Sequence, residues 1–285
     1  MRGRSVILTG ATGGLGRVIA KRLGEAGARI TLAVRDVGRG RELAARIPGS
    51  QVRELDLADL SSVRRFAESW DRRIDVLINN AAVMMVPEGR TADGAELQIG
   101  TNHLGHFALT NLLLPAITDR VVTVVSKAHV FGRIDLDDLH WRRRRYSPMG
   151  AYAQSKLANL LFTRELQRRL AATGSRLALA ADPGFAATDL ARHTERPLLD
   201  VFLGVGIRLA AQGVERSARP ILAATAADVG PATWIGPDGP FGLRGRPAVV
   251  RWPPATTDTY LGQRLWDLSA RETGTDFAPV STSVT

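Results

Sequence analysis

Cysteine is absent from this chain of 285 residues. Its absence excludes disulfides, thiol nucleophiles, cysteine-ligated zinc and iron–sulfur clusters. Long apolar runs are absent too, because no stretch reaches the roughly 18 residues that a membrane-spanning helix needs. The first four residues lead straight into an apolar segment, which leaves no room for a signal peptide. We therefore expect a soluble, cytoplasmic protein with no membrane span.

Lysine is scarce, at positions 21, 127 and 156, so the net charge of +10 comes almost entirely from arginine. The arginines are spread along the chain, which indicates a solvated basic surface rather than a nucleic-acid interface. Nucleic-acid binding would rest on charge alone and would depend steeply on salt. The arginine run at 142–145 is expected in a loop, as a solvated face or as a lip that favours an acidic substrate. The five histidines form no metal-ligand cluster, so we predict no metal site and interpret His103 and His106 as packing or polar-network residues.

Short apolar segments alternate with amphipathic ones, which is typical of parallel βαβ units. The predicted fold is α/β, a Rossmann-type doubly wound parallel sheet in three α/β/α layers, as a single domain over 1–285. Residues 129–150 are interpreted as an insertion, 189–212 as a substrate loop and 275–285 as a frayed tail. Expected strands lie at 5–8, 29–34, 51–55, 74–78, 121–125 and 176–181, and expected helices at 15–26, 40–46, 61–70, 92–114 and 151–172.

A glycine-rich turn links the first expected strand to the first expected helix. Gly10, Gly14 and Gly16 allow a tight turn, close approach of a pyrophosphate and close packing of helix on strand. The helix N-terminus then presents unpaired N–H groups to the phosphates. The segment therefore predicts a dinucleotide site.

The residue after the second expected strand bears on the choice of dinucleotide. Arg35 stands where an acidic residue would hold the ribose hydroxyls of NAD, and a bidentate cation suits a 2′-phosphate instead. Asp36 is next to it and would favour NAD if it faced the ribose. We predict that NADP(H) is preferred over NAD(H).

A phenol and an ammonium lie one helical turn apart at Tyr152 and Lys156. A free phenol has a pKa near 10, and the positive charge of Lys156 is expected to favour the phenolate, as would an oxidised nicotinamide. Tyr152 is then the acid in reduction and the base in oxidation.

These motifs resemble the short-chain dehydrogenase/reductase family over roughly residues 4–230. The resemblance rests on Thr9-Gly-x-x-x-Gly-x-Gly16, Asp56-Leu57, Asn79-Asn-Ala-Ala82 (with Ala82 in place of a glycine), Asn102–Phe107, Ser126, Tyr152-x-x-x-Lys156 and Pro183-Gly184 followed by Thr188. The segments 34–36, 102–107 and 152–159 and the long spacing from Ser126 to Tyr152 are most similar to the retinol-dehydrogenase-like group, near the protochlorophyllide reductases. The lack of cysteine weakens a role like that of the latter. Asp182 stands where the group often has histidine, and we expect it to lie outside the chemistry.

The resemblance implies a catalytic set and a cofactor set. Asn102 would bind a water that connects Lys156 to solvent, Ser126 would hold the substrate oxygen, and Tyr152 and Lys156 would act as above. The predicted catalytic residues are Asn102, Ser126, Tyr152 and Lys156. The predicted cofactor contacts are Thr9, Gly10, Thr12, Gly14, Leu15, Gly16, Arg35, Asp56, Leu57, Asn79, Ala81, Tyr152, Lys156, Pro183, Gly184 and Thr188.

The substrate is the open question. The expected lining is apolar, which favours a bulky hydrophobic ketone, aldehyde or alcohol, although each of its residues would also suit plain core. Reduction of C=C or C=N on the same scaffold, in secondary metabolism for example, is the enzymatic alternative, and a non-catalytic NADP-binding regulator is the alternative from another class. The oligomer is expected to be either a homodimer or a monomer. The lining is expected from Val83, Met84, Met85, Val130, Phe131, Phe185 and 198–202.

Overall fold

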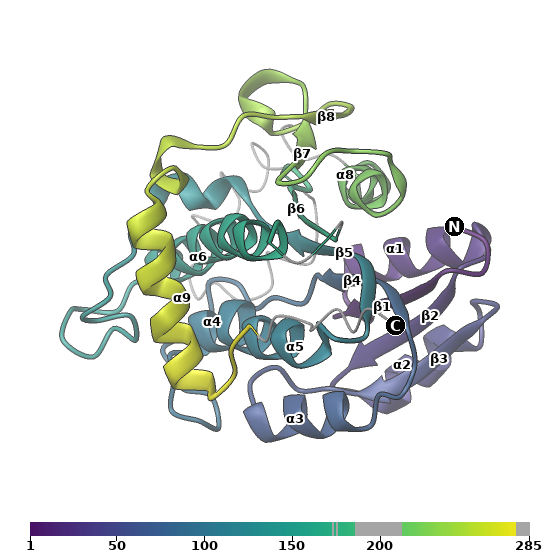
Figure 1. Cartoon of the computed structure of the whole chain (residues 1–285), viewed down its shortest axis with the longest axis horizontal. Coiled ribbons are helices and arrows are strands. Elements are labelled where there is room, and N and C mark those ends of the chain that lie inside the picture. Colours follow the sequence, from purple (N-terminus) through teal and green to yellow (C-terminus); the bar gives the residue numbers. More distant parts are fainter. Residues whose placement is uncertain (173, 175, 186–212, 278–285) are drawn as a thin grey trace, which may run out of the picture.

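The computed structural model describes residues 1–172, 174, 176–185 and 213–277, and an eight-stranded sheet runs through its centre (Figure 1). From one edge to the other, the strands are β3 (Ser50–Glu54), β2 (Arg29–Val34), β1 (Ser5–Thr9), β4 (Ile74–Asn79), β5 (Ile117–Val124), β6 (Leu177–Ala181), β7 (Trp234–Pro237) and β8 (Pro247–Val249). Neighbouring strands are parallel, except that β8 is antiparallel to β7. The order changes direction between β1 and β4, and in such doubly wound sheets ligands bind where those strands end. The predicted α/β Rossmann-type fold is confirmed.

One face of the sheet is covered by α1 (Gly14–Glu25), α2 (Val37–Ala44) and α8 (Val214–Ala226). Alternate strand residues such as Val6 and Leu8 pack there against Ile19 of α1 and Ile221 of α8. Burying one such side chain contributes about 1.5–3 kcal/mol. Because both faces of the sheet are covered, β1 is buried almost throughout instead of alternating with polar residues.

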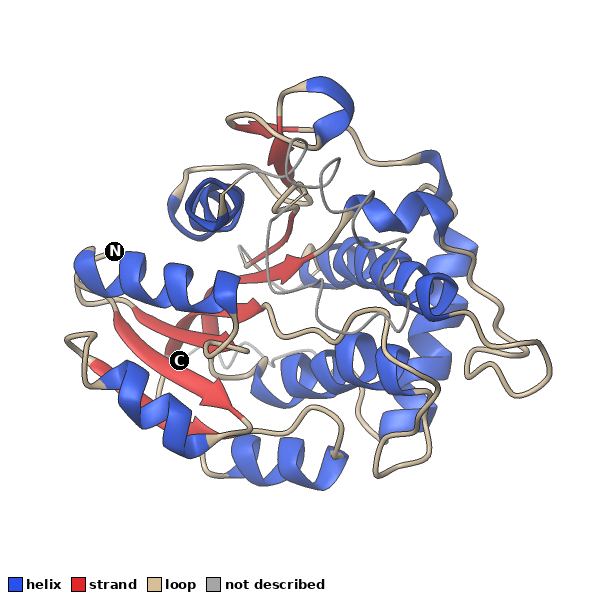
Figure 2. Cartoon of the chain, turned by 180° about the vertical axis from the view of Figure 1, so that it is seen from behind, coloured by secondary structure: helices blue, strands red, loops and turns tan. Residues whose placement is uncertain are grey.

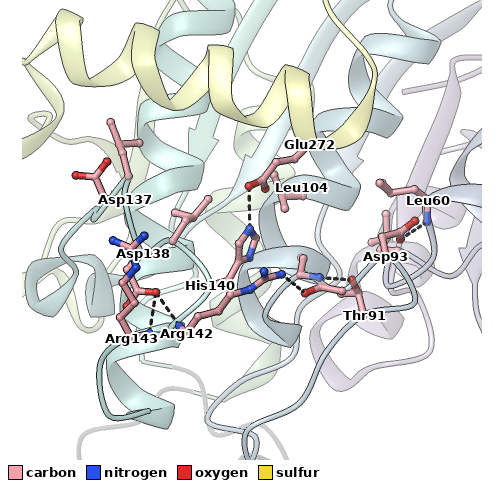
Figure 3. A pocket seen from close by; sticks show the side chains of 16 residues that line it. Leu60, Thr91, Asp93, Leu104, Asp137, Asp138, His140, Arg142, Arg143 and Glu272 are labelled. Carbon is pink, nitrogen blue, oxygen red and sulfur yellow. Dashed lines mark hydrogen bonds and ion pairs between the residues drawn. The ribbon is translucent and has the colours of Figure 1, made fainter.

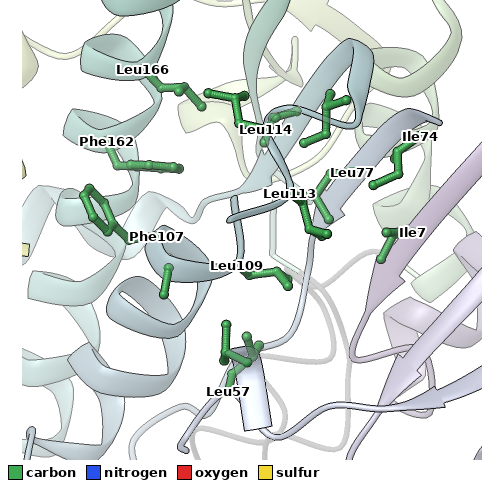
Figure 4. Packing of buried hydrophobic residues seen from close by; sticks show 14 of the residues in the cluster. Ile7, Leu57, Ile74, Leu77, Phe107, Leu109, Leu113, Leu114, Phe162 and Leu166 are labelled. Carbon is green, nitrogen blue, oxygen red and sulfur yellow. The ribbon is translucent and has the colours of Figure 1, made fainter. Parts of the chain in front are cut away.

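The opposite face is covered by α3 (Leu60–Glu68), α5 (Gly105–Leu113) and α6 (Pro148–Leu170), as the view from behind also shows (Figure 2). Helix α9 (Thr259–Thr273) packs against α5 and α6. Phe107 of α5 and Phe162 of α6 meet in this core with ring centroids 5.7 Å apart (Figure 4). Trp266 of α9 lies 4.8 Å from Phe107 by the same measure, so the last helix closes the layer. The core thus fixes α6, which carries the predicted Tyr152 and Lys156.

The six expected strands and five expected helices all form, but one helix begins later than predicted. The region from residue 92 forms a turn in which Gly94 has a φ of +80°, and α4 (Leu97–Ile99) starts only after Glu96 caps the N–H groups of Gln98 and Ile99. A π-helical turn, η1 (Gly100–Leu104), joins α4 to α5. The apolar pattern across 92–114 therefore did not reveal the capping glutamate and the turn glycine that delay the start of the helix.

The expected insertion at 129–150 begins in a 3₁₀ turn, η2 (Lys127–Phe131), and continues as a loop. The Asp138 carboxylate accepts the backbone N–H groups of Arg142, Arg143 and Arg144, which fixes the loop. The guanidinium of Arg144 lies 3.8 Å from the ring centroid of Trp141 and donates to Gln154. The interpretation of the arginine run as a solvated face fits Arg142, Arg143 and Arg145, which are exposed, whereas Arg144 is half-buried in the loop.

The C-terminal region adds α8, β7, β8, α9 and two short 3₁₀ turns, η4 (Pro240–Gly242) and η5 (Pro254–Thr256). Among the described residues, no helix is long and apolar enough to cross a bilayer. Thr188, the expected substrate loop at 189–212 and residues 278–285 of the expected tail lie outside the described residues.

Candidate active site

Four adjacent strands of the sheet end at the candidate site. The glycine turn follows β1, the segment 80–82 follows β4, Ser126 follows β5 and Asp182 follows β6. Because these strands are parallel neighbours, segments far apart in the sequence meet at one edge. Tyr152 and Lys156 approach the same edge from the first half of α6.

The glycine turn has no room for larger residues. A Cβ on Gly10, whose φ is +66°, would lie 2.7 Å from the Cα of Ala81. A Cβ on Gly16 would lie 2.2 Å from the carbonyl oxygen of Gly10. Gly13 caps α1 without a side chain, and no acidic residue occupies the first turn of that helix. The free N–H groups at this N-terminus and the close backbone approach fit a pyrophosphate.

The turn is tied to the loop after β4 by Thr9 and Asn80. The hydroxyl of Thr9 accepts the backbone N–H groups of Asn80 and Ala81, and the Nδ2 of Asn80 donates to the carbonyl of Thr9 at 2.8 Å. Asn79 instead donates to Thr110 on α5. Asn80 was not among the predicted contacts, although it stands in the same Asn79–Ala82 motif.

The residue expected to bind the 2′-phosphate of NADP is exposed and lies next to the N-cap of a helix. Arg35 is exposed directly after β2, and the carboxylate of Asp36 accepts the backbone N–H of Arg39 at 3.0 Å as the N-cap of α2. The Asp36 carboxylate is thus bound to its own helix.

Asp56 and Leu57 lie in a tight turn against the start of α5. The carboxylate of Asp56 accepts the N–H of Ala58 at 2.9 Å. Leu57 is buried, and a Cβ on Gly105 would lie 2.4 Å from its carbonyl oxygen. This contact fixes the turn that was predicted to meet the adenine.

The phenol and the ammonium are both buried. Tyr152 is 8% exposed and Lys156 is 3% exposed. The Nζ of Lys156 donates to the carbonyl of Val124, at the end of β5, at 3.1 Å and lies 5.7 Å from the centroid of the Tyr152 ring. Ser126 is half-buried at the same strand end, and its side chain acts to lower the pKa of Tyr152.

Burial dominates the pKa values of both side chains. Burial raises the pKa of Tyr152 to about 12, the Ser126 side chain opposes this, and the charge of Asp182 adds to it. Burial also lowers the pKa of Lys156 to about 8, against the charge of Asp182. The expectation that Lys156 favours the phenolate stays a prediction, because burial of the phenol has the larger effect on the pKa of Tyr152.

Asn102 is completely buried within η1, where its amide clamps two segments. Its Oδ1 accepts the N–H of Val83 at 2.8 Å, and its Nδ2 donates to the carbonyl of Val83 and to the hydroxyl of Ser155. Its own carbonyl accepts a hydrogen bond from the ring Nδ1 of His106 at 3.0 Å. The water-binding role of Asn102 stays a prediction.

The buried histidines belong to polar networks, as predicted. Because a carbonyl only accepts, His106 is protonated at Nδ1, and its Nε2 accepts from the Thr9 hydroxyl at 2.9 Å. Burial lowers the pKa of His106 to about 4. His103 pairs with Ser269 of α9. Among the described residues no group of side chains is arranged to hold a metal ion.

Asp182 lies within this site, contrary to the expectation that it stays outside the chemistry. It is completely buried, and its Oδ1 accepts the N–H of Gly184 at 2.8 Å. Its charge acts on both Tyr152 and Lys156. The sequence signal was the acidic residue next to Pro183-Gly184.

Several of the expected apolar lining residues are exposed. Val130 and Phe131 of η2 are 63% and 71% exposed, and Phe185, after β6, is 37% exposed. For these three residues the plain-core interpretation is wrong, because core side chains would be covered.

A separate pocket of about 420 Å³ lies between the turn after Thr91, the loop around His140 and the end of α9 (Figure 3). Acidic and basic side chains both line this pocket. The Nε2 atom of His140 lies 2.8 Å from the Glu272 carboxylate, to which it hydrogen-bonds. None of the four predicted catalytic residues is among the described residues that line it.

The comparisons with known proteins agree with this geometry. The family model described as short chain dehydrogenase matches residues 4–198. The chain is 40% identical to human retinol dehydrogenase 13, over 95% of this chain and 85% of that protein. It is 46% identical to human retinol dehydrogenase 12, over 67% of this chain and 64% of that protein.

Two solved structures extend the likeness. An uncharacterised protein from Mycobacterium paratuberculosis is 49% identical, with a TM-score of 0.85, over 97% of this chain and 96% of that one. The RhlG/NADP active-site complex from Pseudomonas aeruginosa is 25% identical, with a TM-score of 0.61, over 79% of this chain and 89% of that one. The chain belongs to the short-chain dehydrogenase family. Within that family it falls in the retinol-dehydrogenase-like group, as its motifs predicted. It is therefore an oxidoreductase of a family that uses a nicotinamide cofactor.

Proposed function

We propose that the protein is an NADPH-preferring reductase of bulky apolar aldehydes or ketones, with Tyr152 as the proton donor. The observation that carries this is the burial of Tyr152 and Lys156 at the strand end that also bears Ser126. Proton transfer to a carbonyl oxygen needs a protonated acid close to a polar anchor, and the placement of Tyr152 and Ser126 supports these two roles.

The residues at the glycine turn fit a nicotinamide dinucleotide. Gly10 and Gly16 leave space for a pyrophosphate, and the uncapped N-terminus of α1 offers N–H groups to it. Arg35 is exposed and Asp36 caps α2, which supports a 2′-phosphate over a free ribose. The RhlG complex with NADP is consistent with this preference.

In the proposed reaction, Ser126 holds the carbonyl oxygen of the substrate next to the Tyr152 hydroxyl. When bound, the cofactor supplies a hydride to the carbonyl carbon. Tyr152 donates its proton to the oxygen, which gives the alcohol, and recovers a proton from solvent. Because burial raises the pKa of Tyr152 to about 12, the phenol is protonated at neutral pH and is able to act as the acid in reduction. Lys156 adds positive charge beside the developing phenolate and would hold the nicotinamide ribose.

The substrate class follows from the apolar side chains around the site. Three large apolar side chains are exposed to solvent here, which is unfavourable unless they contact an apolar ligand. They are Val130, Phe131 and Phe185. The relatives named as retinol dehydrogenases make retinal a sensible first probe. The cytoplasmic location stays a prediction, which cell fractionation tests.

The test is oxidation of NADPH, with NADH in parallel, against retinal, other bulky apolar carbonyls, and C=C and C=N acceptors. Turnover of a carbonyl with NADPH supports the proposal. Turnover of only a C=C or C=N acceptor contradicts the substrate class. Cofactor binding without any turnover contradicts the catalytic role.

A further inference from the structure

Asp182 faces the helix that carries the proton-transfer residues. Successive side chains along a strand point to opposite faces of the sheet, so Asp182 shares its face with Ala178 and Ala180. Those two residues pack against Phe162 and Leu160 of α6. The carboxylate, completely buried, therefore lies on the α6 side of the sheet.

The register of the sheet places the Lys156 ammonium and this carboxylate at the ends of neighbouring strands. Val124 of β5 is level with Ala181 of β6. Lys156 donates to the carbonyl of Val124 at 3.1 Å, so its ammonium lies at the end of β5, and Asp182 follows the end of the neighbouring strand β6. The charge of Asp182 raises the pKa of Lys156, against the burial that lowers it.

One oxygen of Asp182 has a partner and the other does not. Oδ1 accepts the N–H of Gly184, whereas Oδ2 is buried without a hydrogen-bond partner among the described residues. An unpaired buried carboxylate is costly, and it is tolerated where opposite charges lie near it. Burial raises the pKa of Asp182 to about 6, and the Gly184 N–H, Lys127 and Lys156 each act to lower it.

We propose that Asp182 is a positioning residue for proton transfer: its carboxylate is the counter-ion that keeps the buried Lys156 ammonium charged beside Tyr152. The role rests on the proposed function, in which a charged Lys156 stabilises the phenolate that forms when Tyr152 gives up its proton.

The described charged and titratable groups around Asp182 come from two elements. Lys156 and Tyr152 face it from α6, and Lys127 faces it from η2. His129, also on η2, donates through Nδ1 to the carbonyl of Ser126, and burial lowers its pKa so that it is neutral near pH 7. On the other side, β7 presents Ile235 and Gly236, which carry no charge.

The test uses the scarcity of lysine. The chain has three lysines, so ¹³C-lysine labelling gives three side-chain NMR signals, which Lys21→Arg and Lys127→Arg variants assign. The signal of Lys156 should titrate near pH 8 in the native chain. In Asp182→Asn, which keeps an acceptor for Gly184, the midpoint should fall by about one pH unit. Asp71→Asn, which removes a carboxylate 78% exposed, is the matched control and should leave the midpoint in place.

An unchanged Lys156 midpoint in Asp182→Asn would overturn the proposal, whatever the activity. If the asparagine variant does not fold, Asp182→Ser removes the same charge and is read in the same way. Because the titration needs no turnover, it separates this role from the proposed reaction. In active protein, kcat of Asp182→Asn should decline at a lower pH than in the native chain, and a uniform fall at every pH would indicate a merely structural role.

Discussion

The amide of Asn102 donates to the hydroxyl of Ser155 at 2.9 Å, and that hydroxyl donates in turn to the carbonyl of Tyr152. This chain of hydrogen bonds joins η1 to α6 directly beside Lys156. The same amide holds both backbone groups of Val83. The position of the proton-transfer helix therefore depends on one buried asparagine.

Replacement of Asn102 by alanine should destabilise the protein by about 1–3 kcal/mol, because the backbone groups of Val83 lose their partner. Chemical denaturation measures the effect. Ser155→Ala is the matched control, since it leaves both bonds to Val83 in place and should cost less. Equal losses in the two variants would contradict the clamp described for Asn102.

Arg35→Ala should raise KM for NADPH about tenfold or more and leave KM for NADH nearly unchanged, because a charge-assisted hydrogen bond to the 2′-phosphate is worth about 1.5–3 kcal/mol. Steady-state kinetics with both cofactors measure the difference. Arg39→Ala, a charge change on the same exposed stretch, should have a smaller effect. A parallel rise for NADH and NADPH would show that Arg35 does not read the phosphate.

The buried His106 should make the protein less stable in acid. Its pKa is about 4 in the folded chain and near 6.5 in the unfolded chain, so the unfolded state binds the extra proton between these values. The stabilisation is complete above pH 6.5 and is lost as the pH falls to 4, by about 3 kcal/mol. Urea denaturation as a function of pH measures it. His106→Gln should flatten this slope, whereas a slope as steep as that of the native chain would contradict the neutral tautomer.

The buried carboxyl of Asp182 should change the stability of the protein with pH in the opposite direction to His106. Its pKa is raised from 3.8 to about 6, so the folded state holds the proton more tightly than the unfolded state. The stabilisation is present below pH 3.8 and is lost as the pH rises through 6, by about 3 kcal/mol. The stability of the native chain relative to Asp182→Asn should therefore decline from pH 4 to pH 7. A difference that stays constant across this range would mean that the carboxyl is not held in the buried state described.

The sequence predicted the sheet well because its strands are short, apolar and β-branched, and because both faces are buried. The helix ends were predicted less accurately. The start of α4 at Leu97 depends on the Glu96 cap and on Gly94, which an apolar pattern does not reveal. The C-terminal strands and helices had weak periodicity and were not predicted.

Within the site, the spacing of Tyr152 and Lys156 and the glycine turn predicted which elements meet. Burial was not predictable, and burial decides the pKa of Tyr152. The role of Asp182 was also hidden, because it depends on the register that sets β6 beside β5.

The most direct measurement of the central claim is single-turnover oxidation of NADPH with a bulky apolar aldehyde, in the native chain and in Tyr152→Phe, after equal cofactor binding has been established by fluorescence. Loss of a general acid should slow the hydride-transfer step about a hundredfold or more. That result, with NADH slower than NADPH in the native chain, is the one the structure predicts. A Tyr152→Phe variant that reduces the aldehyde at the native rate would contradict the account.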